Sequence, residues 1–198
     1  MEARLLDGKV AIITGASYGM GRSMAELFAE EGASVVITAR HQEKLDEVVD
    51  AIKAKGGKAV GVVADVCSTA DTKKVFGTAL DTFGDVDILI NNAGGYPSEI
   101  YDKVGHQAIK IWEWSEEQWD QIIKTNLKIP FLCLNKVVPV MIKQHSGDIV
   151  SVSSRMGRIA SQMGGYAVAK GGIVTLTKTT AIQTKEYGIK VNAVAPGM

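Results

Sequence analysis

Short apolar runs rich in β-branched residues alternate with helical stretches along the whole chain, and this alternation limits the possible folds more than any other feature. The expected strands are apolar on both faces, which is typical of a parallel sheet covered by helices on both sides. Right-handed crossovers then build an open α/β sheet in three layers, which we expect to form one domain over residues 1–198. The expected strands are 9–14, 34–39, 59–65, 86–94, 148–154 and 189–196, and the expected helices are 21–32, 41–57, 68–84, 115–143 and 165–187.

Composition argues against several functional classes. The 22 basic and 22 acidic residues balance, so no net charge indicates a nucleic-acid or membrane-surface partner. No apolar run reaches the about 20 residues of a membrane helix, and the charged first residues are unlike a signal peptide, so we expect a cytoplasmic protein. Cys67 and Cys133 are expected to be small buried apolar residues, and the scattered His41, His106 and His145 do not support a metal site.

The turn after the first expected strand is rich in glycine and reads TGASYGMG over residues 14–21. In doubly wound sheets, ligands bind beyond the carboxyl ends of the strands. Glycines at 15, 19 and 21 allow a tight turn and a close approach of backbone to a pyrophosphate, which the amide groups of the next helix then face. The turn therefore favours a dinucleotide ligand, although a glycine-rich turn is weak support by itself.

The end of the second expected strand bears on which dinucleotide binds. NAD sites usually place Asp or Glu here to hold the ribose hydroxyls, whereas this chain has Ala39 and Arg40. An arginine suits a 2′-phosphate, so the sequence favours NADP(H), with NAD(H) as the alternative. Two observations keep that alternative open: Arg40 can equally begin the next helix in solvent, and Tyr18 stands where a basic residue would have reinforced the prediction.

A tyrosine and a lysine stand one helical turn apart in GGYAVAKGG, residues 164–172. Among the five tyrosines only Tyr166 has a lysine, Lys170, four residues further on. We expect the lysine to stabilise the phenolate and lower the pKa of the phenol from its usual value of about 10. The four flanking glycines each cost about 1 kcal/mol of helix propensity, which we attribute to the close approach of a flat cofactor ring and a substrate.

These segments together resemble the short-chain dehydrogenase/reductase family, in its subgroup with TGxxxGxG and YxxxK motifs. The shared segments, in order, are TGASYGMG, ADV (64–66), NNAG (91–94), Asn126 in TNLKIPF, SVSS (151–154), YAVAK (166–170) and VNAVAPG (191–197). The resemblance implies a Rossmann-like doubly wound sheet with strand order 3-2-1-4-5-6. It also implies an oxidoreductase that transfers hydride between NADP(H) and a carbonyl or secondary alcohol, as a 3-oxoacyl reductase does, and that forms a homo-oligomer, either a dimer or a tetramer.

The resemblance also implies roles for individual residues. Tyr166 would exchange the hydroxyl proton, Lys170 would hold the nicotinamide ribose, and Asn126 would hold a water molecule that links the lysine to solvent. A serine would polarise the substrate oxygen. The cofactor-binding residues implied are Gly15, Ser17, Tyr18, Gly19, Met20, Gly21, Arg40, Asp65, Val66, Asn92, Ala93, Gly94, Tyr166, Lys170, Pro196 and Gly197.

Two criteria disagree about the catalytic serine. The local motif SSRMG matches Ser154, whereas the family's usual spacing before the tyrosine matches Ser153. Adjacent residues of a strand point to opposite faces, so only one of the two can reach the substrate. We prefer Ser154 and keep Ser153 as the alternative.

The chain departs from the family pattern in two places. Residues 95–121 are longer than the usual connection, and Tyr96, Tyr101, Trp112 and Trp114 could line a substrate pocket, cover the site as a lid or contact a neighbouring subunit. The sequence also stops at APGM, before the seventh strand and the substrate-closing segment that family members usually have. The alternative functions are therefore a non-catalytic dinucleotide sensor, which would normally lack Tyr166 or Lys170, and an inactive truncated subunit.

Overall fold

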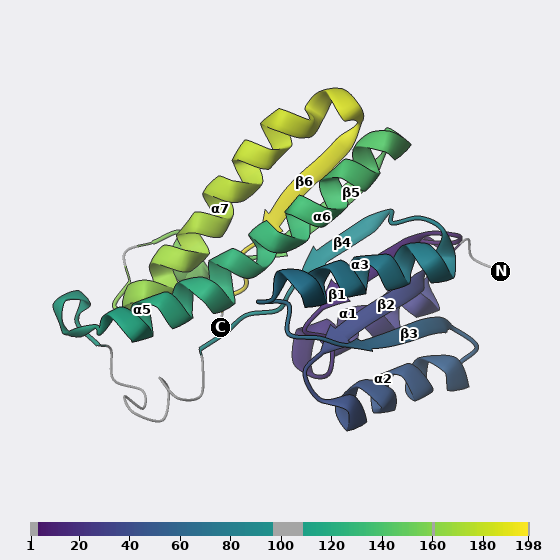
Figure 1. Ribbon diagram of the computed structural model, residues 1–198, viewed down its shortest axis with the longest axis horizontal. Coiled ribbons are helices and arrows are strands. Elements are labelled where there is room, and N and C mark those ends of the chain that lie inside the picture. The colour runs from purple at the N-terminus through teal and green to yellow at the C-terminus, as the bar shows by residue number, and fades with distance from the viewer. Residues whose placement is uncertain (1–3, 97–108, 160, 198) are drawn as a thin grey trace.

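Six parallel strands form one sheet in a computed structural model of the protein, which describes residues 4–96, 109–159 and 161–197. The strand order is β3-β2-β1-β4-β5-β6, which confirms the expected topology (Figure 1). Each neighbouring pair is parallel, so all the described strands end at the same edge of the sheet. The strands are β1 Val10–Thr14, β2 Ser34–Ala39, β3 Lys58–Val63, β4 Ile88–Asn91, β5 Gly147–Val152 and β6 Ile189–Val194.

Helices pack on both faces of the sheet, as the two-sided apolar pattern predicts. Ile13 of β1 belongs to a buried cluster with α1 and α2, whereas the adjacent Ile12 belongs to a second cluster with α3 and α6. Helix α7 packs against this second cluster through Leu176 and Ala181. The helices are α1 Gly19–Glu30, α2 Gln42–Ala54, α3 Thr69–Phe83, α5 Glu116–Ile123, α6 Ile129–Gln144 and α7 Gly164–Thr184.

The helix boundaries have local causes. The Ser68 hydroxyl accepts a hydrogen bond from the Asp71 amide at 3.3 Å, so this serine caps the start of α3 as expected. The helix ends at Gly84, whose φ of +89° favours glycine over other residues. Three 3₁₀ turns are also present: η1 Ile111–Glu113, η3 Arg155–Gly157 and η4 Lys185–Tyr187.

The single helix expected over 115–143 is divided into three parts. A π-helical segment, η2 Lys124–Lys128, lies between α5 and α6. Pro130 has no N–H, so it cannot donate the α-helical hydrogen bond to the carbonyl of Asn126. A π-helical turn is wider than an α-helical turn and holds one more residue, which accommodates this break in the hydrogen-bond pattern. Asn126 lies in this segment and is fully buried.

Strand β4 is shorter than the expected 86–94, because its last residues bond elsewhere. The amides of Asn92 and Ala93 each donate to the side-chain hydroxyl of Thr14 at 3.0 Å rather than to a backbone carbonyl of β1 or β5. The chain therefore leaves the sheet at the point where the site begins.

No described helix is both long and apolar enough to cross a bilayer.

Candidate active site

In the turn between β1 and α1, the backbone is packed so closely at Gly15 and Gly21 that a side chain does not fit at either position. Gly15 has φ +66°, and a Cβ there would lie 2.9 Å from the Cα of Ala93. A Cβ on Gly21 would collide with the Gly15 carbonyl oxygen and come within 2.6 Å of Asn92 Nδ2. Gly19 has φ +57°, a left-handed conformation that glycine adopts more readily than other residues do.

The first turn of α1 is free to bind an anion. Tyr18 precedes the helix without capping it through its side chain, and no acidic residue stands in the first turn. The orphan amides and the positive end of the helix dipole therefore face the carboxyl edge of the sheet. We call the glycine turn over residues 14–21 and the uncapped amides of α1 the cradle. Tyr18 and Met20 are 72% and 53% exposed, so their side chains lie outside this cradle.

Thr14 and Asn92 join the glycine turn to the end of β4. The Thr14 hydroxyl accepts from two amides of the NNAG segment, and Asn92 Nδ2 donates to the carbonyls of Thr14 and Gly15 at 2.9 and 3.0 Å. These bonds give the NNAG segment a structural role, because they hold the glycine turn against the end of β4. Thr14 was missed as a functional residue, although its place directly before Gly15 is the signal that could have indicated it.

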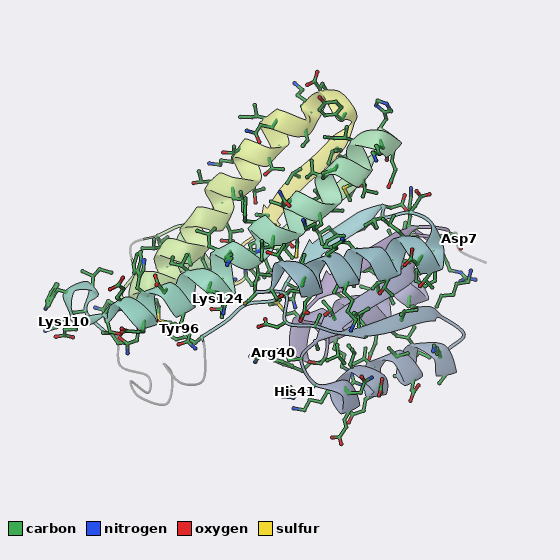
Figure 2. The ribbon with its side chains drawn as sticks, viewed as in Figure 1. Asp7, Arg40, His41, Tyr96, Lys110 and Lys124 are labelled. Atoms are coloured by element: carbon green, nitrogen blue, oxygen red, sulfur yellow. The ribbon has the colours of Figure 1, made fainter. Side chains whose placement is uncertain are left out.

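Charged side chains gather where β2 and β3 end. Arg40 is exposed and has no hydrogen bond or ion pair with any residue that the structure describes. Asp65 accepts from the Cys67 amide at 3.0 Å. Burial and the nearby Asp65 raise the pKa of the Cys67 thiol to about 11, while Lys124 and Arg40 act in the opposite direction, so all three charged groups lie around this cysteine. Figure 2 labels Arg40 and Lys124 on this side of the molecule.

The other residues predicted at this edge differ in exposure. Val66 is 6% exposed and belongs to the core, so only its backbone is available to a ligand. Away from this edge, Cys133 of α6 is fully buried, as expected of a small apolar residue, and burial raises the pKa of its thiol to about 12. Beyond β6, the Pro196 carbonyl accepts from the Arg155 amide at 3.1 Å, which ties this segment to the end of β5.

Tyr166 and Lys170 lie together on the first two turns of α7. Lys170 is 4% exposed, and its Nζ lies 5.6 Å from the centre of the Tyr166 ring. The same Nζ donates to the Val152 carbonyl at the end of β5, at 2.9 Å. The helix thus brings both side chains to one side, next to the strand that carries the two serines.

The two serines have different surroundings, and these favour Ser154 as the catalytic candidate. The Ser154 hydroxyl lies close enough to Tyr166 to lower the pKa of its phenol, and Ser154 Oγ accepts from the Met156 amide at 3.2 Å. Ser153 is buried, and its hydroxyl donates to the Lys170 carbonyl at 2.7 Å. Ser153 therefore fixes the backbone of α7 and has no free hydroxyl for a substrate.

The prediction that Lys170 lowers the pKa of the Tyr166 phenol is wrong for the protein without bound cofactor, because that pKa is raised. Burial raises the pKa of Tyr166, and the nearby Ser154 hydroxyl opposes this rise only in part. Burial also lowers the pKa of Lys170 to about 8, because the ammonium is removed from water. The ammonium is bonded to the Val152 carbonyl, so it faces the ring rather than forming a pair with the phenol oxygen.

The explanation for the four glycines around YAVAK also needs correction, because packing explains three of them directly. A Cβ on Gly164 or Gly165 would come within 2.7 or 3.1 Å of the Trp114 ring, and one on Gly172 would come within 2.8 Å of Leu127. A Cβ on Gly171 would lie 3.2 Å from the Gly157 carbonyl oxygen. The glycines let α7 approach α5, the π-helical segment and η3 closely.

Asn126 connects the end of β4 to this region. Its Oδ1 accepts from the Gly95 amide at 2.9 Å, and its Nδ2 donates to the Gly95 carbonyl at 2.8 Å. A Cβ on Gly94 would lie 3.0 Å from Asn126 Oδ1 and 3.5 Å from Lys170 Nζ. Gly94 thus leaves room for both polar groups, and the side chain of Asn126 is a clamp on Gly95.

The aromatic residues of the long connection have different surroundings. Tyr96 packs against Tyr166, Trp114 packs against the start of α7, and Trp112 is 76% exposed with Lys110 Nζ 5.5 Å from its ring centre. Tyr101 and His106 fall outside the described residues. Within those residues, no group of three histidine, cysteine or acidic side chains is arranged to hold a metal ion.

The comparison with known proteins agrees with this geometry. The model of the short chain dehydrogenase family matches residues 9–198. The 3-oxoacyl-(acyl-carrier-protein) reductase FabG of Staphylococcus epidermidis is 39% identical over 191 residues, which are 96% of this chain and 74% of that protein. The uncharacterized oxidoreductase YxbG of Bacillus subtilis is also 39% identical, over 97% of this chain and 67% of its own length.

Solved structures give the same result. The chain superimposes on a putative short-chain alcohol dehydrogenase from Sinorhizobium meliloti with a TM-score of 0.87 and 34% identity, covering 97% of this chain and 73% of that one. A putative short-chain dehydrogenase/reductase from Burkholderia xenovorans gives a TM-score of 0.87 with 32% identity over 98% and 75%. The chain therefore belongs to the short-chain dehydrogenase family, and is an NAD(P)-dependent oxidoreductase that acts on CH–OH and C=O groups.

Proposed function

We propose that this oxidoreductase transfers a hydride between NADP(H) and a ketone or secondary alcohol, with Ser154, Tyr166 and Lys170 as its catalytic residues. The observation that carries the proposal is their arrangement: the Ser154 hydroxyl lies close enough to Tyr166 to lower the pKa of its phenol, and the buried ammonium of Lys170 lies next to the Tyr166 ring. The nicotinamide, when bound, supplies or accepts the hydride. The residues of the chain hold the reacting oxygen and move its proton.

The raised pKa of Tyr166 favours carbonyl reduction. A buried phenol with a raised pKa is protonated at neutral pH, so it is ready to donate its proton to the oxygen of a carbonyl. The Ser154 hydroxyl can donate a second hydrogen bond to that oxygen and polarise the C=O bond. The phenolate left after transfer lies beside Lys170, whose pKa of about 8 keeps it largely cationic at pH 7. In alcohol oxidation the same groups act in reverse.

The cradle at the carboxyl edge fits a dinucleotide. A Cβ on Gly21 would fill the space against the Gly15 carbonyl, so the turn keeps its backbone accessible, and the uncapped amides of α1 suit a pyrophosphate. Arg40, exposed and unpaired among the described side chains, would bind the 2′-phosphate of NADP(H). Asp65 and the NNAG segment complete the proposed cofactor site.

The relatives suggest a substrate class and an assembly. Because the Staphylococcus relatives are named 3-oxoacyl reductases, we propose 3-oxoacyl thioesters as the first substrates to test. We also propose that the protein forms a dimer or tetramer. Large apolar side chains on the outer surfaces of α6 and α7 support this proposal, since Phe131 is 52% exposed and Ile182 is 78% exposed.

A cofactor assay tests the proposed function. The protein is mixed with NADPH or NADH and with a panel of 3-oxoacyl thioesters and simple ketones, and the absorbance of the reduced nicotinamide is followed. We expect NADPH to be oxidised with at least one carbonyl. We expect Arg40→Asp to lower kcat/KM for NADPH about 10- to 100-fold by removing a bidentate phosphate contact, with little effect on NADH.

The matched control is Lys44→Asp, which makes the same charge change on the exposed face of α2. Two results would contradict the proposal. Cofactor binding without turnover of any carbonyl would favour a dinucleotide sensor. A preference for NADH over NADPH in the unaltered protein would reject the assignment of Arg40.

A further inference from the structure

Tyr96 contacts both the ring of Tyr166 and the backbone that leads into the helix of Tyr166. The two ring centres are 5.3 Å apart with an angle of 31° between the ring planes, which is within the range of favourable aromatic pairs. The Tyr96 hydroxyl also donates to the Met163 carbonyl at 3.2 Å. Met163 is the residue directly before α7, so Tyr96 contacts both the catalytic ring and the start of the catalytic helix.

The Met163 carbonyl couples these contacts. It also accepts a hydrogen bond from the amide of Tyr166, at 3.1 Å. A carbonyl oxygen has two lone pairs, so it can accept from the Tyr96 hydroxyl and the Tyr166 amide together. The backbone that sets the position of Tyr166 is therefore bonded directly to Tyr96.

Tyr96 is itself held in place from both sides. The preceding residue, Gly95, is bonded through its amide and its carbonyl to the buried side chain of Asn126. Behind the two tyrosines, Trp114 packs on the glycines that begin α7 and donates from its indole N–H to the Ile109 carbonyl at 3.2 Å. Tyr96, Trp114 and Tyr166 belong to one small apolar cluster around Ile122 and Ala169.

We propose that Tyr96 is a positioning residue for the catalytic tyrosine, because it packs against the ring of Tyr166 and shares the Met163 carbonyl with its backbone. The proposal rests on the proposed function, in which Tyr166 transfers the proton. Proton transfer needs the donor and acceptor within hydrogen-bond reach, so a small displacement of the phenol lowers the rate strongly. Nothing in this arrangement requires Tyr96 to exchange a proton itself.

The ionisation of the two phenols agrees with these separate roles. Burial raises the pKa of Tyr96, and the neighbouring Tyr166 raises it further, so Tyr96 stays neutral while Tyr166 reacts. Burial also raises the pKa of Tyr166. Within the part of the chain that the structure describes, the titratable side chains in contact with the Tyr166 ring are Tyr96 and Lys170, and the Tyr96 ring covers part of the phenol. Removing that ring admits water and should lower the pKa of Tyr166.

Two variants separate the contributions of the ring and the hydroxyl. Tyr96→Phe keeps the ring and loses the bond to Met163, and we expect kcat to fall about threefold, as for the loss of one neutral hydrogen bond. Tyr96→Ala loses both contacts, and we expect kcat to fall at least about tenfold with KM changed less than about twofold, because the reacting geometry and not binding is affected. Tyr187→Phe, in the 3₁₀ turn η4 that follows α7, is the control and should match the unaltered enzyme in both constants.

The second readout does not depend on turnover. The pKa of Tyr166 is measured in the free protein by NMR of ring-labelled tyrosine, with Tyr166→Phe used for assignment. We expect it to fall by about one unit in Tyr96→Ala as the phenol becomes hydrated, and to stay unchanged in Tyr187→Phe. If Tyr96→Ala does not fold, Tyr96→Leu keeps the volume without the ring and is measured in the same way.

The outcomes decide between roles for Tyr96. An unchanged kcat and an unchanged Tyr166 titration in the folded Ala or Leu variant would overturn the proposal. A raised KM with kcat preserved would also overturn it, and would make Tyr96 a substrate contact. If the unaltered protein has no activity, the proposed function fails, whereas the NMR titration still tests whether Tyr96 covers Tyr166.

Discussion

At the carboxyl end of β1 the site consists of backbone, whereas at the carboxyl end of β5 it consists of buried side chains. The first region depends on positions where a Cβ does not fit, above all Gly21, and on amides that no side chain caps. The second depends on Tyr166, Lys170 and Ser154, whose ionisation and hydrogen bonds follow from burial. A steric change should therefore disable the first region, whereas a change of one functional group should disable the second while the fold persists.

Among three tests that contrast the two regions, the largest effect is expected from the two serines of the side-chain region. Ser154→Ala should lower kcat about 100-fold or more, because the hydroxyl that polarises the substrate oxygen is lost. Ser153→Ala should leave kcat within a few-fold but lower the free energy of unfolding by about 1 kcal/mol, since its buried bond to the Lys170 carbonyl is lost. Steady-state kinetics and denaturant unfolding of both variants measure this contrast. A larger kcat loss for Ser153→Ala would reverse the assignment.

A second, smaller effect concerns the pH dependence of stability. The pKa of Lys170 is about 8 in the folded protein against 10.5 in the unfolded chain. Between these values the unfolded chain holds the proton that the folded protein has lost, so the free energy of unfolding rises as pH increases from about 8 to 10.5. Comparison with Lys170→Met, which cannot titrate, isolates this rise. We expect the free energy of unfolding of the unaltered protein to rise by about 2 kcal/mol more than that of the variant. Parallel curves for the two proteins across that range would show that Lys170 is not desolvated.

The smallest effect in this series tests the backbone region. Gly21→Ala should raise the Kd for NADPH about tenfold, because the new methyl group pushes the Gly15 carbonyl out of the cradle. The matched control is Gly77→Ala in the middle of α3, where a Cβ meets nothing within 4 Å. That control should leave the Kd unchanged and stabilise the protein by roughly 0.5–1 kcal/mol. Equal Kd values for both variants would mean that the turn does not form the pyrophosphate site.

The difference between the two regions also explains what could be predicted from the sequence. Strand–helix alternation and glycine spacing are local patterns, so the open parallel sheet and the tight turn at Gly15 and Gly21 followed from them. The strand order followed only from the family resemblance. The pair Tyr166 and Lys170 also followed, since one helical turn places both on one side.

Features that depend on distant contacts could not be predicted in this way. The glycines of α7 pack against Trp114 and Leu127, which come from a different part of the chain. Burial outweighs the lysine in setting the pKa of Tyr166, and the depth of burial is known only once the layers are assembled. The clamp of Asn126 on Gly95 needs a π-helical turn, which has no reliable signal in the sequence.

Replacement of Tyr166 by phenylalanine tests the central claim most directly, since it removes a single oxygen atom. Turnover of the best carbonyl substrate and the Kd for NADPH are measured side by side in Tyr166→Phe and in the unaltered protein. Because the phenol is the proposed proton donor, kcat should fall about 1,000-fold or more, while the Kd for NADPH stays within about threefold. A Tyr166→Phe enzyme that keeps most of its kcat would contradict the assignment of Tyr166 as the proton donor.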